Sequence, residues 1–587
     1  MLKKIIKISF VSILIFSGFL FSKSDEAKVA LLYSNYTEKL LPKNSTFVHD
    51  QITFWELFFI QNKINYAVIT DDDLESGLSN DYSVLVLPNS IVLSNDELNN
   101  VELFLREGNS VFANKMVGEK DKSGNERGNE ILNTLFGLSY KGAIAKSELS
   151  KVHSIKGDTQ LSINIPAGFR LRVDASNLPI KAKVNSTYTH ALGYWYNDDF
   201  PYAGLPDDSL TTSIAFGKKD KGKFVWIGFD FSEVVGSKIH QDAFNNLLLN
   251  SISWLEGKNS VWVETWSHGK KSAVIVSCDV EFEFDNIVNA AKILNQENIE
   301  GQYYILTDVM KAEALNQILK NGDIGLHGDN HDVFQFQPYN QQYKRLETAR
   351  QTLEQKSSRK ILGFRPPETV YDDKTVEALK NLHYTFLASD NFEDRSVPQF
   401  YDSDKDLLII PETGYDDYNL LIRFKIEDFH KQAERYLLDY KRVNDEDGLY
   451  VLNYHTQLQC IKDNVEALRI CIDKFKENNS WITTANKVND WWRIKNNLSV
   501  SIKKEFEDSL QIEIKNSGNL KAENAVVGLF LGNSKLRNNI IVSEKNKDLK
   551  YDFDKENNQL KIYVDELNSF ETKLIVIKTK NPAVAGQ

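Results

Sequence analysis

Hydrophobic and polar positions follow two different rhythms in the first 255 residues. Short apolar runs such as VALLYS (29–34), YAVIT (66–70) and SVFA (110–113) are typical of buried strands, whereas WELFFIQNKIN (55–65) has helical periodicity. Ser94 and Glu97 form the pattern of a helix-capping box ahead of an amphipathic run that ends at Gly108. Strands that alternate with helices predict a doubly wound α/β domain over residues 27–257.

A boundary-like stretch, GKNSVWVETWSHGKKS (257–272), precedes a second alternating series. Seven apolar runs follow, most of them separated by helical patterns such as YKRLETARQTLEQ: 273–277, 301–306, 323–328, 361–367, 384–389, 407–411 and 448–455. Seven strands with intervening helices predict an incomplete (β/α)7-type barrel, and we assign it to residues 268–496.

After residue 496 the pattern changes to period-two alternation with polar turns. LSVSIKK, LQIEIKNSG, AVVGLFLG, LKIYVDE and TKLIVIKT are typical of half-buried antiparallel strands. Residues 498–580 are therefore predicted to form a small β-sandwich.

The N-terminus carries the layout of an export signal. MLKKIIK supplies three lysines, and the uncharged run ISFVSILIFSGFLF follows it. We assign residues 1–25 to a signal peptide and expect a periplasmic, cell-envelope or secreted protein, with membrane contact only through an uncleaved signal anchor. The net charge of −12 disfavours anionic partners, so nucleic acid is not expected.

The number of cysteines limits the disulfide bonds that the chain can form. Three cysteines are too few for a disulfide scaffold; Cys460 and Cys471 can pair in an oxidising compartment or stay as buried thiols.

The layout of residues 27–257, with its late GKFVWIGFDF stretch, resembles the glutamine-amidotransferase-like, flavodoxin-like domains attached to many carbohydrate enzymes. Active members carry a cysteine on a strand-to-helix turn, and residues 1–277 contain no cysteine. The resemblance therefore implies a non-catalytic accessory domain.

Titratable residues gather at the ends of the predicted barrel strands. The C-terminal ends of such strands meet at one mouth, where barrels of this type build their sites. The candidates, in chain order, are Asp279, Glu281, His327, His331, Arg365, Asp390 and His455.

Two histidines and a carboxylate are suited to a divalent metal ion. Imidazole nitrogen and carboxylate oxygen are ligands of Zn²⁺, and three protein ligands leave one position open for water. His327 and His331 are four residues apart, so a helical turn beginning at His327 would put both on one face. We expect them to bind a divalent ion, with Zn²⁺ as the first choice, together with Glu281.

Residues 273–495 resemble the polysaccharide deacetylase family, the NodB-homology domains of carbohydrate esterase family 4. The ordered motifs that carry the resemblance are SCDVE, HGDNH, RPPE, SDN and NYH. The resemblance implies a metal-dependent hydrolase that removes N-acetyl groups from the amino sugars of an extracytoplasmic polysaccharide or peptidoglycan. A glycan is then the expected partner.

The chemistry of these residues gives each a role in that reaction. Asp279 is the expected general base and His455 the general acid. Arg365 is expected to pair with Asp279 and keep it ionised, and Asp390 to orient His455.

The first motif departs from the family pattern of two adjacent aspartates, because Asp279 and Glu281 are separated by Val280. The added methylene of Glu281 places metal affinity in question, and Glu283 and Asp285 are close enough in sequence to substitute. The other acidic residues are not expected to be metal ligands. Asp329 and Asp332 are interpreted as solvated or capping residues, and Asp416–Asp417 as a polar turn. Two alternatives stay open, namely an inactive glycan-binding or scaffold protein and another amide C–N hydrolase on the same barrel.

Overall fold

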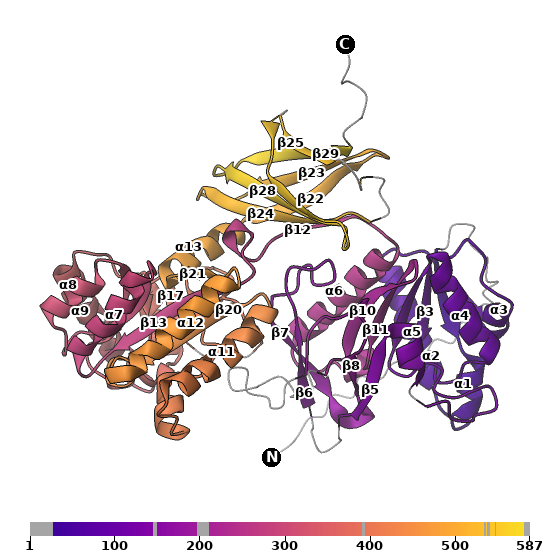
Figure 1. Ribbon diagram of the computed structural model, residues 1–587, viewed down its shortest axis with the longest axis horizontal. Coiled ribbons are helices and arrows are strands. Elements are labelled where there is room, and N and C mark those ends of the chain that lie inside the picture. Colours follow the sequence, from indigo (N-terminus) through magenta and orange to yellow (C-terminus); the bar gives the residue numbers. More distant parts are fainter. Residues whose placement is uncertain are drawn as a thin grey trace, which may run out of the picture.

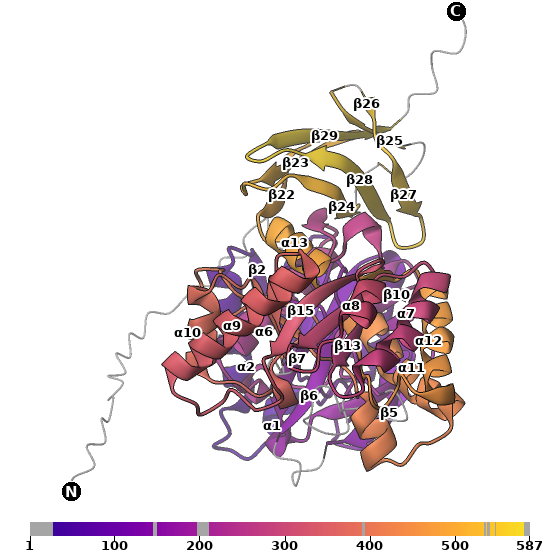
Figure 2. The same ribbon diagram turned by 90° about the vertical axis from the view of Figure 1, so that its left-hand side faces the viewer.

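The computed structural model describes residues 28–128, 130–144, 150–195, 211–389, 394–532, 536, 540–545 and 547–579. Three bodies follow one another along the chain: an α/β body, a barrel-like body and an all-β body (Figure 1). Both views place the all-β body against the junction of the other two (Figure 2). The predicted signal segment 1–25 lies outside the described residues.

The first body is built on a seven-stranded sheet in the order β2-β1-β3-β4-β11-β10-β9. Its strands are β1 (Val29–Tyr33), β2 (Tyr66–Thr70), β3 (Val84–Pro88), β4 (Ser110–Asn114), β9 (Thr189–Ala191), β10 (Ile214–Lys219) and β11 (Gly222–Ile227). The first four and β11 are parallel, and β9 and β10 are antiparallel additions at one edge. Two antiparallel two-stranded sheets accompany it: β5 (Leu138–Ala143) with β8 (Ile180–Val184), and β6 (Ser150–Ile155) with β7 (Phe169–Asp174).

Helices cover both faces of this sheet. Apolar side chains of α2 (Phe47–Gln61) and α6 (Lys238–Leu255) share one core, and those of α3 (Asp71–Glu75), α4 (Asn95–Glu107) and α5 (Glu130–Phe136) share the other. The short helix α1 (Asn35–Leu40) precedes them. The predicted capping box is confirmed: Ser94 Oγ accepts from the Glu97 backbone N–H at 3.1 Å, and Glu97 Oε2 accepts from the Ser94 N–H at 2.6 Å. Gly108 ends α4 at φ 105°, a left-handed conformation that favours glycine.

The central body contains all seven predicted strands in a curved sheet of order β18-β19-β17-β16-β15-β14-β13-β20. They are β13 (Ala273–Val280), β14 (Gly301–Leu306), β15 (Gly322–Gly328), β16 (Gly363–Phe364), β17 (Phe386–Ser389), β19 (Leu408–Pro411) and β20 (Leu449–His455). These seven are parallel, so the incomplete barrel is confirmed. Two short strands add to it, β18 (Gln399–Phe400) on β19 and β21 (Trp481–Thr483) on β13.

Helices wrap the outside of this sheet, and a large apolar core fills the space between the two. They are α7 (Ile287–Gln296), α8 (Ala312–Ile318), α9 (Tyr339–Ser357), α10 (Asp373–Asn381), α11 (Phe429–Asp445) and α12 (Glu466–Glu477). Helix α13 (Ala485–Lys495) packs instead on the opposite face of the sheet, in a second core with Ile275, Tyr304 and Val451. Because the strands are parallel, the residues that follow β13, β15, β16 and β20 emerge at one rim.

The third body has two antiparallel sheets with a shared core. One sheet holds β22 (Leu498–Glu505), β23 (Ser509–Asn516), β29 (Thr572–Thr579), β25 (Ile540–Glu544) and β26 (Lys547–Asp548). The other holds β24 (Ala522–Phe530), β28 (Gln559–Leu567), β27 (Tyr551–Asp554) and also β12 (Ser260–Val263). Strand β12 belongs to the stretch predicted to be a boundary, so this sheet includes a strand from ahead of the barrel.

The structure also bears on two predictions made outside the barrel mouth. Cys278, Cys460 and Cys471 are buried as free thiols, so the unpaired alternative holds for Cys460 and Cys471. Within the described part of the chain, no helix combines the length and apolar character that a membrane crossing requires.

Candidate functional site

Three candidate metal ligands converge at the rim of the barrel. Glu281 follows β13, His327 lies near the end of β15, and His331 comes from the bend after it. Glu281 Oε1 lies 2.9 Å from Nε2 of His327 and 2.9 Å from Nε2 of His331. The four-residue spacing of the two histidines suggested a shared helical turn. In the structure there is no such turn, because His327 lies in β15 and His331 in the bend that follows it. Instead Gly328, at φ 142°, lets the strand bend so that His331 returns toward His327.

The chemistry of these donors fits a divalent cation. Nδ1 of His327 lies 2.9 Å from the backbone carbonyl of Arg365, so this nitrogen carries the proton and donates it. In the neutral imidazole, Nε2 then presents a lone pair toward Glu281 Oε1. Two acceptors face each other at 2.9 Å, an arrangement that a cation or a proton between them stabilises.

The longer side chain of Glu281 still reaches the histidines. Gln457 donates from Nε2 to the other carboxylate oxygen of Glu281 at 2.8 Å and holds its orientation. Burial raises the pKa of Glu281, but the imidazoles of His327 and His331 beside it outweigh burial and hold that pKa well below its usual range. The bond with Glu281 in turn raises the pKa of His331.

The two acids considered as substitutes for Glu281 lie elsewhere. Glu283 is exposed and accepts from Asn286 Nδ2 at 2.7 Å, and Asp285 pairs with Lys311. Asp329 pairs with Arg345 at 2.6 Å, so an ion pair holds it instead of the solvated or capping role that the sequence favoured.

Asp279 lies beside the ligand group at the end of β13, buried and held from two sides. Its Oδ1 accepts from Arg365 Nη1 at 3.1 Å, and its Oδ2 accepts from Asn453 Nδ2 at 3.0 Å. The Arg365 guanidinium also stacks on the ring of Tyr304, 4.4 Å from the centroid. Burial raises the pKa of Asp279, but the Arg365 guanidinium together with His327 and His455 outweighs burial and lowers it, so the carboxylate is ionised at neutral pH.

His455 ends β20 on the other side of Asp279, with its Nε2 3.8 Å from Asp279 Oδ2. Its Nδ1 lies 2.5 Å from Oδ1 of Asp417. Oδ2 of Asp417 accepts from the backbone N–H groups of His455 at 2.8 Å and of Gln459 at 3.0 Å. Burial lowers the pKa of His455, but the Asp417 carboxylate, together with Asp279 and Glu281, outweighs burial and raises it well above its ordinary value.

Asp417 therefore occupies the orienting position that we had assigned to Asp390. Asp390 lies outside the described residues, and Nδ1 of His455 is held by Asp417. Asp417 is fully buried and begins the π-helix η6 (Tyr418–Arg423), so it is not part of a simple polar turn. Its neighbour Asp416 accepts instead from the backbone N–H of Asn419 at 2.8 Å.

A cavity of about 610 Å³ joins these groups. The cavity is lined by five side chains that the sequence analysis singled out as candidates: Asp279, Glu281, His327, His331 and His455. The cavity wall also includes two exposed aromatic side chains, Phe282 and Tyr418, and three polar residues of the rim: Glu368, Asn419 and Arg423.

Three positioning residues escaped the sequence reasoning. Asp417 was interpreted as a turn residue, and Asn453 and Gln457 were not singled out although they flank His455 in NYHTQ. Alternate residues of a strand point to one face, so Asn453 and His455 were both detectable as polar positions facing the mouth. Gln457, beyond the end of β20, carried no such signal.

Comparisons with known proteins place this site in context. Residues 269–387 match the family profile described as polysaccharide deacetylase. A search of curated proteins gives no match to the chain.

Three solved structures with similar regions share little sequence with the chain. A Mycobacterium smegmatis protein classed as a polysaccharide deacetylase is 18% identical, over 39% of this chain and 92% of that chain, with a TM-score of 0.36. An allantoinase is 12% identical, over 39% and 92% of the two chains, with a TM-score of 0.34. A family 4 acetyl xylan esterase from Clostridium thermocellum, in complex with a cobalt ion, is 11% identical over 37% and 90%, with a TM-score of 0.28.

Proposed function

Since the central body carries a polysaccharide deacetylase domain, we propose that this chain is a metal-dependent deacetylase that removes N-acetyl groups from amino sugars. The substrate is an extracytoplasmic polysaccharide or peptidoglycan, and the N-terminal signal-like segment supports an exported location. The observation that carries the proposal is the shared cavity, which is lined by the group Glu281, His327 and His331 together with Asp279 and His455.

Glu281, His327 and His331 would hold the metal ion, and we take Zn²⁺ as the first choice. A divalent ion bound there supplies Lewis acidity toward the acetyl carbonyl and makes water more acidic. Gln457 fixes the Glu281 carboxylate, and the Arg365 carbonyl fixes the tautomer of His327. The chain thus orients Glu281 and His327 in advance.

Asp279 accepts the proton of the attacking water. The lowered pKa keeps Asp279 ionised, but it also makes Asp279 a weak base that needs an acidified water as its partner. The two hydrogen bonds from Arg365 and Asn453 fix the plane of the carboxylate, so its free lone pairs point in set directions.

His455 donates a proton to the departing amine. A sugar amine leaves poorly without that proton, and the raised pKa of His455 keeps its imidazolium populated at neutral pH. Asp417 holds the ring through Nδ1 and leaves Nε2 facing the cavity. Acetate and a free amino sugar are the products.

Acetate release from a panel of N-acetylated oligosaccharides tests the proposal, with chelator and with added Zn²⁺. We expect release that chelator abolishes and Zn²⁺ restores, and a large loss of kcat in His455→Ala with metal retained. A protein that purifies without stoichiometric metal and releases no acetate would favour the inactive glycan-binding or scaffold alternative. Release only from small amides would favour another C–N hydrolase.

A further inference from the structure

The cavity at the barrel mouth presents two exposed aromatic side chains. Phe282 is 52% exposed and Tyr418 is 46% exposed, and both line the space that contains the candidate catalytic groups. Ligand cavities are typically walled by apolar and aromatic side chains, with a few polar groups that fix the orientation of the ligand. The two rings are therefore surfaces that a substrate can contact.

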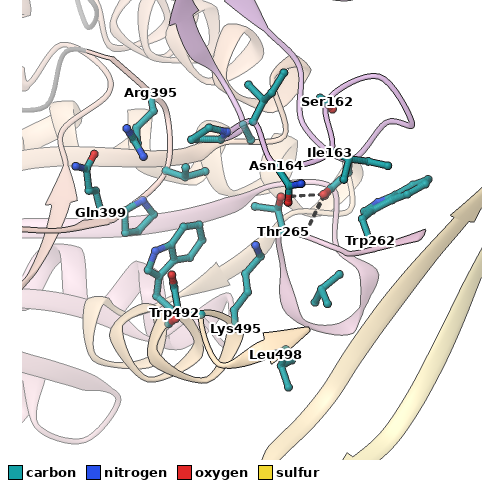
Figure 3. A pocket seen from close by; sticks show the side chains of 18 of the residues that line it. Ser162, Ile163, Asn164, Trp262, Thr265, Arg395, Gln399, Trp492, Lys495 and Leu498 are labelled. Carbon is teal, nitrogen blue, oxygen red and sulfur yellow. Dashed lines mark hydrogen bonds between the residues drawn. The ribbon is translucent and has the colours of Figure 1, made fainter. Parts of the chain in front are cut away.

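A second cavity, of about 600 Å³, lies at the junction of the three bodies and differs in this respect (Figure 3). Both tryptophans in its wall, Trp262 and Trp492, are buried. The ring of Trp492 packs against that of Trp266, with the centroids 5.5 Å apart. The tryptophan rings of this cavity are covered by the protein, whereas the two rings at the barrel mouth are open to a ligand.

Phe282 lies beside the candidate metal ligands. It directly follows Glu281, and its ring centroid is 6.0 Å from that of His331. The hydroxyl of Thr456 donates to the Phe282 carbonyl at 2.7 Å and accepts from the Glu281 N–H at 3.1 Å. Because one hydroxyl bonds both residues, the backbone of Phe282 is anchored next to the ligand group.

Tyr418 lies beside the expected general acid. It directly follows Asp417, which holds Nδ1 of His455, and it begins the π-helix η6. Two polar side chains of the same helix, Asn419 and Arg423, also line the cavity. Arg423 Nη1 donates to Asn419 Oδ1 at 3.1 Å, and the guanidinium carbon lies 5.8 Å from the Tyr418 ring centroid. This wall thus offers an aromatic ring together with polar groups that can bond sugar hydroxyls.

The two rings belong to separate parts of the cavity rim. Phe282 follows β13, Tyr418 lies on the connection after β19, and four strands separate β13 from β19 in the sheet. When the acetamide of one sugar occupies the catalytic groups, the neighbouring sugars of its chain extend away from it in two directions. The rings are therefore placed to contact different sugars of one chain.

We propose that Phe282 and Tyr418 bind the sugars on either side of the one that is deacetylated, so that the substrate is a chain of at least three sugars. The inference rests on the proposed deacetylase function and adds a length requirement to it. The apolar face of a pyranose packs against an aromatic ring, and binding energy from the flanking sugars orients the acetamide at the catalytic groups. A single amino sugar or a small amide leaves both rings without a partner.

Calorimetric titration of the metal-loaded His455→Ala protein tests the proposal without turnover. The ligands are N-acetylglucosamine and its β1,4-linked and β1,6-linked tetramers. We expect at least one tetramer to bind at least about tenfold more tightly than the monosaccharide. Phe282→Ala or Tyr418→Ala, added to this background, should each weaken binding of that tetramer about fivefold or more and leave the monosaccharide nearly unaffected.

Phe506→Ala is the matched control, because Phe506 is 54% exposed, lies between β22 and β23 of the third body and does not line the cavity. Equal affinity for the monosaccharide and both tetramers, or an unchanged tetramer Kd in folded Phe282→Ala and Tyr418→Ala proteins, would overturn the proposal. Should Phe282→Ala not fold, Phe282→Leu decides in its place, since it removes the ring and keeps an apolar side chain. Failure of the proposed function is a separate result, namely a wild-type protein that binds the tetramer through both rings but releases no acetate from it.

Discussion

Replacing Asp417 by asparagine removes one charge beneath His455 and changes little else in volume. Asp417 accepts from two backbone N–H groups through Oδ2 and binds Nδ1 of His455 at 2.5 Å through Oδ1. If the asparagine oxygen keeps the two backbone donors, its NH₂ group faces Nδ1. Nδ1 must then be an acceptor, and the imidazolium that protonates the leaving amine cannot form in that arrangement.

The expected fall in kcat can be estimated from the hydrogen bond between Asp417 and His455 that the substitution removes. A hydrogen bond to a charged group is worth about 1.5–3 kcal/mol, and general acid catalysis contributes about 10²–10⁴ in rate. We therefore expect kcat of Asp417→Asn to fall about 10²-fold or more, or about 3 kcal/mol of barrier. The raised pKa of His455 should also drop, so the alkaline limb of the kcat profile should move to lower pH.

Acetate release over a pH series measures both effects, with metal content and thermal unfolding as checks on folding. Asp428→Asn is the matched control, since Asp428 caps α11 by accepting from the Lys431 N–H at 3.0 Å and does not line the cavity. Combining Asp417→Asn with His455→Ala should cost little more than His455→Ala alone, because the two residues act as one unit. A folded Asp417→Asn protein with full kcat and an unmoved alkaline limb would refute the reasoning.

Three further predictions concern separate parts of the molecule. Asp279→Asn should abolish acetate release while metal stays bound; full activity in that variant would remove Asp279 from the base role. His327→Ala should lose both metal and activity, and stoichiometric metal by elemental analysis would contradict the ligand assignment. In Gly528→Ala the new Cβ would lie 2.2 Å from the ring of Trp262, so we expect about 1–3 kcal/mol of destabilisation in chemical denaturation; unchanged stability would mean that β12 packs less tightly than described.

The sequence predicted that the candidate ligands converge because parallel strands bring their C-terminal ends to one rim. Glu281, His327 and His455 each follow or end an apolar run long enough to be recognised, so their convergence needed only the barrel. Asp417 needed more. It lies on the connection between β19 and α11, and its approach to His455 depends on the path of that loop rather than on any periodicity.

The strand β12 shows a second limit of pattern reading. SVWV is only four residues long, and its partner in β24 lies more than 260 residues further along the chain: Ser260 pairs with Phe530, and Val263 with Val527. Local alternation identifies a strand but does not name its neighbour, so residues 257–272 were interpreted as a boundary. The three predicted bodies were recognisable, whereas the strand that ties the first to the third was not.

Because β12 pairs with β24, no single truncation point separates the third body from the rest of the chain without breaking a strand pair. Ending the protein at residue 496 would leave β12 with both edges unpaired, and producing residues 498–579 alone would expose the edge of β24. Either fragment would offer a template for strand addition between molecules and should aggregate. During synthesis, β12 must also wait for almost half of the protein to follow before it can dock, which makes completion of the fold a late event.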